Sequence, residues 1–165
     1  MEINIRPYHP KDVEAIVAIL NYYIANSTAL YDYEPRTFEQ QQAILEEKLK
    51  KGFPVIVATI DERVVGFGYY SEFRFREAYK YTVEHSVYVM PNEHGKGIGK
   101  VVIQNLIRLA KEQRLHTMIG VIDSENESSI AFHEHFGFKT VGIIKESGFK
   151  FDRWLHSVIM QLMLD

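Results

Sequence analysis

Hydrophobic and polar residues alternate along several short stretches of the chain, and apolar residues recur at helical spacing along others. Ile3 and Ile5 alternate with polar neighbours, which predicts a first strand that ends near Arg6. Six further stretches have strand-like patterns, at residues 53–60, 64–71, 83–90, 117–123, 141–147 and 154–164. Apolar residues three and four positions apart predict four helices, which begin near Pro10, Thr37, Ile98 and Asn126.

Residues that favour turns and helix ends separate these stretches. Thr37 with Gln40 three positions later is typical of a capping box at a helix start, and Gly52 is placed to end that helix. The short polar segment 61–63 predicts a hairpin between its two flanking strands. A second hairpin is expected to turn around Gly148, between the last two strands.

The predicted order is strand, two helices, three strands, helix, strand, helix and two strands. An order of this kind predicts a mixed α/β fold in which helices pack against one sheet. The chain has 165 residues and contains no linker, repeat or low-complexity run, so we expect a single domain over residues 1–165.

Composition narrows the function without identifying it. The chain is 46% hydrophobic and 25% charged, as in ordinary globular domains, and its net charge of −3 argues against a nucleic-acid partner bound through a basic surface. It has no cysteine, which excludes disulfides and thiol nucleophiles. No stretch indicates a signal peptide or a membrane span, so we expect a cytoplasmic protein with no membrane partner. His133 and His135 lie two positions apart on a predicted helix and do not share a face, so no metal site is expected.

The segment after the strand over 83–90 has the properties of an anion site. Pro91 ends the strand, and Gly95, Gly97 and Gly99 then lead into a helix. Glycines allow close approach to their backbone, and the first N–H groups of a helix lack internal partners, so this loop suits a phosphate or pyrophosphate. The spacing fits neither a Walker A loop nor a dinucleotide fingerprint. A glycine-rich loop that only turns the chain remains the alternative.

The sequence around this loop resembles the GNAT superfamily of acetyltransferases. Gly97-x-Gly99 after the strand ending at Val89 is similar to that family's acetyl-CoA pyrophosphate loop, although His94 stands where the family has Gln or Arg. The segment 126–138 is similar to a second family motif, with His133 in place of its usual Tyr. Within the superfamily, three stretches resemble the branch of phosphinothricin and methionine-sulfoximine N-acetyltransferases, at residues 81–89, 123–126 and 148–155.

The resemblance implies a GNAT fold, in which one mixed, mostly antiparallel, twisted sheet carries helices on both faces. It implies transfer of an acetyl group from acetyl-CoA to the amine of a small amino-acid-like acceptor, in a homodimeric enzyme. Acetylation of a protein or peptide amine, or non-catalytic sensing of acyl-CoA, are the alternatives. The cofactor-binding residues that it implies are Val87, Tyr88, Val89, His94, Gly95, Lys96, Gly97, Ile98, Gly99, Lys100, Asn126, Ser128 and Ser129.

Acetyl transfer requires a base for the amine, a donor for the carbonyl oxygen and a proton for the leaving thiolate. Without cysteine, direct attack of the amine on the thioester is favoured. Glu84 is the candidate base, with a salt-bridged strand carboxylate as the alternative. The resemblance implies that the N–H of Val89 holds the oxygen and that His133 protonates the thiolate, although His133 is equally consistent with a structural histidine.

An acceptor with an anionic group needs cations on the far side of the pocket. Arg74 and Arg76 have the planar guanidinium forks that suit such a group, although a solvated loop is also consistent with them. An aromatic and basic set is predicted to line the same pocket, and it consists of Tyr81, Lys150, Phe151 and Trp154. Core packing is the alternative for Phe151 and Trp154.

Overall fold

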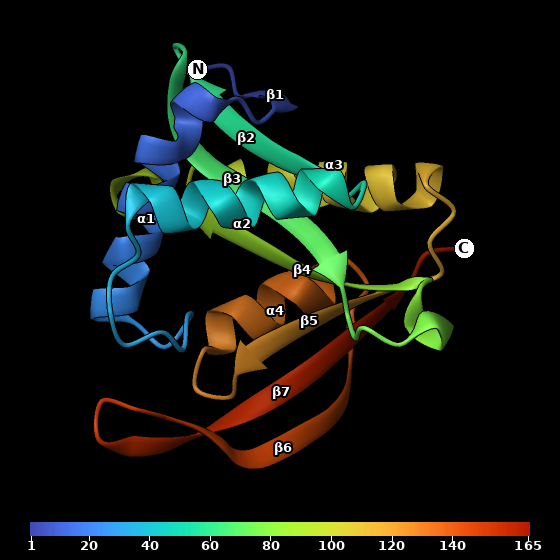
Figure 1. Cartoon of the computed structure of the whole chain (residues 1–165). Coiled ribbons are helices and arrows are strands. Elements are labelled where there is room, and N and C mark those ends of the chain that lie inside the picture. Colours follow the sequence, from blue (N-terminus) through green and yellow to red (C-terminus); the bar gives the residue numbers. More distant parts are fainter.

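The computed structural model describes all residues from 1 to 165, and a seven-stranded sheet runs through the whole molecule (Figure 1). The strand order is β1-β2-β3-β4-β5-β7-β6, and every neighbouring pair is antiparallel except the parallel pair of β4 and β5. The prediction of a mixed, mostly antiparallel sheet is therefore confirmed. The strands are β1 (Asn4–Pro7), β2 (Val55–Ile60), β3 (Arg63–Glu72), β4 (Thr82–Val89), β5 (Thr117–Asp123), β6 (Lys139–Lys150) and β7 (Arg153–Met163).

Helices cover both faces of this sheet, as predicted. They are α1 (Val13–Asn26), α2 (Phe38–Lys50), α3 (Ile98–Glu112) and α4 (Glu127–His135), with short 3-10 turns at Pro10–Asp12, Glu77–Tyr79 and Pro91–Glu93. Figure 1 shows α1 and α2 in front of the sheet and α3 behind it. None of the helices is both long enough and apolar enough to cross a membrane.

Two hydrophobic cores result, one on each face, and β4 contributes to both. Val83 and its alternate neighbours Val87 and Val89 pack in the cluster that contains α3, whereas Tyr88 and Met90 pack in the cluster that contains α1. This is the alternation expected of a strand that is covered on both sides. The two cores fix β4 in place, so that its side chains have defined positions.

The feature that creates the site is the separation of β4 from β5. The two strands pair only at their beginnings, from Thr82 opposite Thr117 to Glu84 opposite Ile119. Beyond Glu84 the strands diverge, while β5 continues to pair with β7 along its full length (Figure 1). The later part of β4 therefore exposes backbone groups toward an opening in the sheet.

Two predictions that depend on residues close together in the sequence are confirmed, the capping box at Thr37 and the first hairpin. The capping box forms as predicted, with the Gln40 N–H donating to Thr37 Oγ1 at 3.1 Å and the Thr37 N–H donating to Gln40 Oε1 at 2.9 Å. The first hairpin turns at Asp61 and Glu62, whose φ angles of 49° and 63° suit a tight two-residue turn.

The predicted turn around Gly148 is wrong. Gly148 lies within β6 and pairs with Leu155, and the chain turns at Phe151 and Asp152, whose φ angles are 54° and 59°. A Cβ at residue 148 would come within 2.5 Å of the Tyr31 ring. A glycine is needed at this position because a side chain would clash with a distant residue, and not because the chain turns there.

Candidate active site

A cavity of about 600 Å³ lies where β4 and β5 separate. One wall is β4 from Glu84 to Val89, and the opposite wall is β5 from Gly120 to Asp123. The start of α4 closes one end, and the segment between α1 and α2 contributes residues 28–31. The opening in the sheet is therefore a cavity that an extended ligand can enter along strand β4.

The glycine-rich loop leaves a run of backbone donors without acceptors. Gly95 and Gly97 have φ angles of 80° and 81°, a conformation that side chains rarely adopt. The first internal bond of α3 is from the Val101 N–H to the Gly97 carbonyl at 3.2 Å. None of the N–H groups from Gly95 to Lys100 donates to an acceptor of this chain. These donors, at the positive end of a fifteen-residue helix, fit the pyrophosphate of a nucleotide cofactor.

Glu93 holds the glycine-rich loop in place through ion pairs. Its carboxylate is almost fully buried and pairs with Lys96 and with Arg63, whose Nη2 lies 2.8 Å from Glu93 Oε1. The two cations hold the pKa of Glu93 below its usual value. Lys96 is thus engaged with Glu93, whereas Lys100 makes no ion pair within the chain. The backbone N–H groups, more than the lysines, are therefore the main donors of this loop.

His94 departs from the family pattern in a way that the structure explains. Its Nε2 lies 2.9 Å from the hydroxyl of Tyr23, which donates to the Val89 carbonyl at 2.5 Å. Burial raises the pKa of Tyr23 to about 12, so the hydroxyl keeps its proton. His94 therefore joins the loop to α1 and to the end of β4, and Tyr23 is a cavity residue that sequence reasoning missed.

The N–H of Val89 points into the opening. The next residue, Met90, donates its N–H to Val65 of β3 at 2.8 Å, and successive N–H groups of a strand point to opposite sides. Val89 consequently directs its N–H away from β3, toward the space between β4 and β5. A carbonyl oxygen in the cavity would find a donor there.

Glu84 is the carboxylate on the cavity wall. It is half-buried at the last position of β4 that pairs with β5, directly opposite Ser71 of β3. Burial raises the pKa of this carboxyl, and the charge of Lys48 on α2 opposes part of that rise. Lys48 itself lies 4.2 Å from the centroid of the Tyr69 ring and 3.4 Å from Ser71 Oγ. A carboxylate with a raised pKa in a cavity is suited to accept a proton from an ammonium group.

The start of α4 brings three of the predicted cofactor residues together. Asn126 caps the helix, because its Oδ1 accepts the Ser129 N–H at 3.2 Å and the Ser128 hydroxyl at 3.0 Å. Its amide nitrogen makes no bond within the chain and remains available to a ligand. His133, one turn further along, is buried beside His85 and lines the same cavity.

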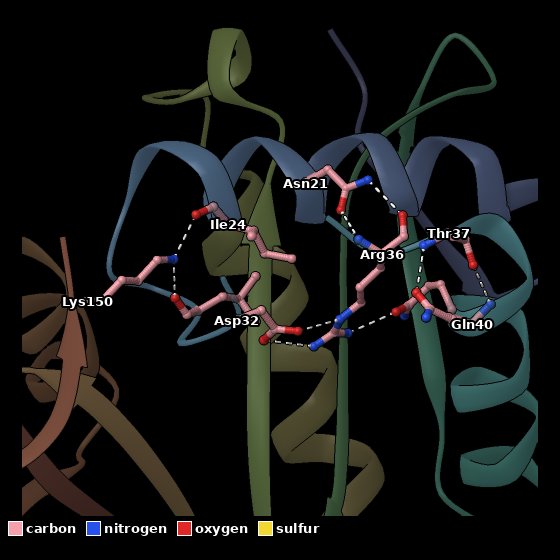
Figure 2. Close-up of polar contacts among 9 residues, drawn as sticks. Asn21, Ile24, Asp32, Arg36, Thr37, Gln40 and Lys150 are labelled. Carbon is pink, nitrogen blue, oxygen red and sulfur yellow. Dashed lines mark hydrogen bonds and ion pairs between the residues drawn. The ribbon is translucent and has the colours of Figure 1, made fainter. Parts of the chain in front are cut away.

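The prediction that Lys150 lines the acceptor pocket is wrong. Lys150 is 4% exposed, and its Nζ donates to the carbonyls of Ile24, Ser27 and Leu30 at 2.7, 2.9 and 2.7 Å. Figure 2 shows this side chain reaching from β6 to the end of α1. All three protons of the ammonium group are used, so Lys150 supports the cavity wall without facing a ligand.

The other predicted acceptor residues lie outside the cavity of this chain. Arg74 and Arg76 are exposed on the loop after β3, where each guanidinium lies against the neighbouring phenylalanine ring and borders a separate hollow. Tyr81 is 55% exposed, and Trp154 is 61% exposed against Phe149. The structure does not bring these four residues together, and their part in acceptor binding stays a prediction.

The segment between α1 and α2 supplies cavity residues that sequence reasoning missed. Its residues 28–31 line the cavity, and Thr28 donates its hydroxyl to Asp123 of β5. Arg36 binds Asp32 at 3.0 Å, while its backbone bonds twice to Asn21 of α1 (Figure 2). The only sequence signal was an irregular, tyrosine-rich stretch between two helices, which indicates no particular position for its side chains.

Comparison with known proteins decides between the possible nucleotide cofactors. Residues 5–159 match the family described as acetyltransferase (GNAT) domain. The chain belongs to the GNAT acetyltransferase family. As a member, it is an acetyltransferase that uses acetyl-CoA as the acetyl donor, and the free N–H groups of the loop fit the pyrophosphate of that donor.

Three known proteins are similar to this chain over nearly its whole length. An L-methionine sulfoximine/L-methionine sulfone acetyltransferase of Pseudomonas paraeruginosa is 38% identical over 100% of this chain and 96% of its own length. The solved structure of a phosphinothricin acetyltransferase from Sinorhizobium meliloti in complex with AcCoA has a TM-score of 0.95 and 34% identity, covering 99% of this chain and 89% of that one. A ribosomal-protein-alanine N-acetyltransferase structure from Brucella melitensis has a TM-score of 0.96 and 37% identity, covering 97% and 99%.

Proposed function

We propose that this GNAT enzyme acetylates the amine of a small amino-acid-like acceptor of the methionine sulfone, methionine sulfoximine or phosphinothricin type. The observation that carries the proposal is a half-buried carboxylate, Glu84, on the wall of a cavity that also receives the Val89 N–H. The relatives named for these acceptors support the choice of substrate class.

The reaction proceeds by direct attack in a ternary complex, since the chain has no cysteine to form a thioester intermediate. Glu84 takes a proton from the acceptor ammonium, directly or through water, and frees its nitrogen lone pair. The new C–N bond forms while the Val89 N–H stabilises the charge on the carbonyl oxygen. The nitrogen of the adduct then releases its second proton to solvent, the C–S bond breaks, and the thiolate that leaves takes up one proton.

The donor side of the site follows from the free backbone groups. The pyrophosphate binds the N–H groups of the loop, with Gly95, Gly97, Ile98 and Gly99 as backbone donors and Lys96, Lys100 and His94 around them. The pantetheine extends along Val87, Tyr88 and Val89 by main-chain pairing. Asn126, Ser128 and Ser129 at the start of α4 meet its amides.

Steady-state CoA release with a panel of amines tests the proposal. We expect turnover with methionine sulfone, methionine sulfoximine and phosphinothricin, and at least about tenfold lower kcat/KM with a peptide that begins with alanine. The peptide is included because one relative is named for a ribosomal protein. Faster turnover of the peptide would replace the small acceptor by a protein, and no release with any amine would leave a non-catalytic acyl-CoA-binding protein.

Assembly and location complete the proposal. We propose a homodimer that forms through the β6–β7 hairpin, because Ile143, Phe151 and Trp154 expose more than half of their surface there. We also propose that residues 1–165 act as one catalytic domain in the cytoplasm, where acetyl-CoA is available. Light scattering after gel filtration should give twice the mass of the 19.2 kDa chain.

A further inference from the structure

Two buried histidines meet at the point where β4 and β5 separate. His85 of β4 places its Nδ1 3.0 Å from the carbonyl oxygen of Ile119, and its Nε2 lies 2.9 Å from His133 Nε2. His133 in turn places its Nδ1 2.7 Å from the carbonyl oxygen of Ser129. The two rings therefore form a chain of three polar contacts from β5, through β4, to α4.

Residue 120 is a glycine because of this pair. A Cβ there would lie 2.9 Å from Cε1 of His85 and 3.4 Å from Cδ2 of His133. The first distance is shorter than real Cβ contacts, so any side chain at Gly120 would displace the rings. The backbone of β5 is thus shaped to hold the two imidazoles together.

The three contacts require three protons. A carbonyl oxygen can only accept, so both Nδ1 atoms must carry a hydrogen to bind Ile119 and Ser129. A neutral imidazole has a single N–H, so in a neutral pair both Nε2 atoms are bare and oppose their lone pairs at 2.9 Å. Moving either hydrogen to Nε2 transfers the repulsion to a carbonyl at 2.7 or 3.0 Å. A single added proton turns all three contacts into hydrogen bonds.

We propose that His85 and His133 act as one unit that binds a single extra proton, which His133 delivers to the thiolate of CoA after acetyl transfer. The delivery step rests on the proposed function. His133 lines the cavity and is the catalytic residue of the unit, while His85 is a positioning residue that acts through it.

The delivery step balances with the contacts already present. The Nδ1–H bond of His133 breaks and an S–H bond forms, while the shared proton remains on His133 Nε2 and donates to His85. The bare Nδ1 then opposes the Ser129 carbonyl oxygen at 2.7 Å, with the Ser129 hydroxyl at 3.5 Å as its one donor, so this state favours the uptake of a new proton. Both rings are neutral after this step, and the unit regains its proton from solvent before the next cycle.

Charge and burial limit the unit to one added proton. Burial lowers the pKa of His133, so this ring alone would be unprotonated near neutral pH. Burial and the adjacent His133 lower the pKa of His85 to about 3, which excludes a second added proton. One proton is stabilised by three hydrogen bonds and by the negative carboxyl end of α4, since His133 lies in its last turn.

No other titratable group faces the pair. β5 presents Ile119 and Gly120, α4 presents Ser129 and Phe132, and Phe138 packs against both rings. Glu84 is adjacent to His85 in the chain but points to the opposite face of β4. The pH dependence of the unit therefore arises from the two histidines themselves.

Nuclear magnetic resonance of the 15N-labelled full chain without substrates tests the proton count. At pH 7 we expect three protonated nitrogens among the four ring nitrogens of His85 and His133, and one common titration step for both rings. The exposed His135, two residues from His133, provides the matched control, and His135→Gln should leave these signals unchanged. Only two protonated nitrogens at pH 7 would overturn the proposal.

Kinetics of His85→Gln test the delivery step. The glutamine amide still reaches His133 but holds no proton that titrates, so a purely structural role would survive the change. We expect kcat to fall about tenfold or more and its alkaline limb to move to lower pH, because a lone buried His133 loses its proton more readily. The KM for acetyl-CoA should not change, and His135→Gln should behave as wild type.

An unchanged kcat and an unchanged alkaline limb in a folded His85→Gln would overturn the delivery step. Thermal unfolding reports whether the variant folds, and His85→Asn is a second variant that keeps the donor to Ile119 but cannot reach His133. We expect the same loss in both. A wild-type protein that acetylates no amine would overturn the proposed function. The NMR count of protonated nitrogens would still test the shared proton, because it requires no substrate.

Discussion

The two ends of the proposed site are built by different means. At the proposed donor end, consecutive backbone N–H groups from Gly95 to Lys100 have no acceptor within the chain, and their geometry follows from two glycines and one helix start. At the proposed acceptor end, side chains from β4 and from the segment between α1 and α2 line the cavity, and distant residues such as Lys150 hold that segment. A site made of backbone is encoded locally, whereas a site made of side chains depends on the whole fold.

Removing the base should have the largest effect. Glu84→Gln keeps the shape of the side chain but cannot take the ammonium proton, so kcat should fall by about 100-fold or more. Acetyl-CoA affinity by calorimetry should be unchanged, because the donor end does not use this carboxylate. Near-normal turnover across the pH range would remove Glu84 from the mechanism.

A change in the backbone of the loop should act on the donor end alone. Valine at Gly97 must adopt a φ of 81°, which costs about 1–2 kcal/mol, and its branched Cβ meets the cofactor. In Gly97→Val we expect acetyl-CoA to bind about tenfold more weakly or worse. Gly52→Val is the matched control, since Gly52 has a φ of 84° in equally open space far from the loop. Equal acetyl-CoA affinities of the two variants would argue against the loop as the cofactor site.

Loss of the support beneath the acceptor wall should appear first in stability. Lys150→Met leaves three carbonyls without their charged donor, and we expect the free energy of unfolding to fall by about 2–4 kcal/mol. The acceptor KM should rise by a few fold while the KM for acetyl-CoA stays constant. Lys145→Met, an exposed change on the same strand, should alter none of these quantities. Unfolding midpoints in urea and steady-state kinetics provide both comparisons.

The smallest expected effect concerns pH. The rate requires Glu84 as a carboxylate, so activity should fall as the pH falls through the pKa of Glu84, which burial raises above its usual value. Lys48 opposes that rise, so Lys48→Met should move the acid limb of kcat/KM to higher pH by a few tenths of a unit to about one unit. Lys51→Met, at the exposed residue that directly follows the same helix, should not move it. A shift to lower pH would contradict the role of Lys48.

The difference between the two ends also explains what could be predicted from the sequence. The order of elements, the capping box at Thr37 and the glycine-rich loop depend on residues close together in the chain, and each was predicted. The predicted turn around Gly148 is wrong because the residue that requires a glycine there, Tyr31, lies 117 positions away in sequence. Lys150 was misread for the same reason, since its three carbonyl partners lie more than a hundred residues earlier.

The histidine pair is a further case of the same limit. His85 and His133 are 48 residues apart, and no periodicity connects them. His133 was a candidate because its position resembles a family motif, but the sequence contains no signal that pairs it with His85. Arg74 and Arg76 show the opposite case. They are close in sequence to the strand that bears Glu84, but they do not lie at the cavity.

A crystal structure of the full chain with CoA and methionine sulfone tests the central claim most directly. We predict that the pyrophosphate accepts hydrogen bonds from the N–H groups between Gly95 and Lys100 and that the sulfur of CoA lies between β4 and β5. We predict that the acceptor amine lies within hydrogen-bond distance of Glu84, about 2.6–3.2 Å, or one water away. A pyrophosphate bound elsewhere, or an amine on the far side of β4 from Glu84, would contradict the account.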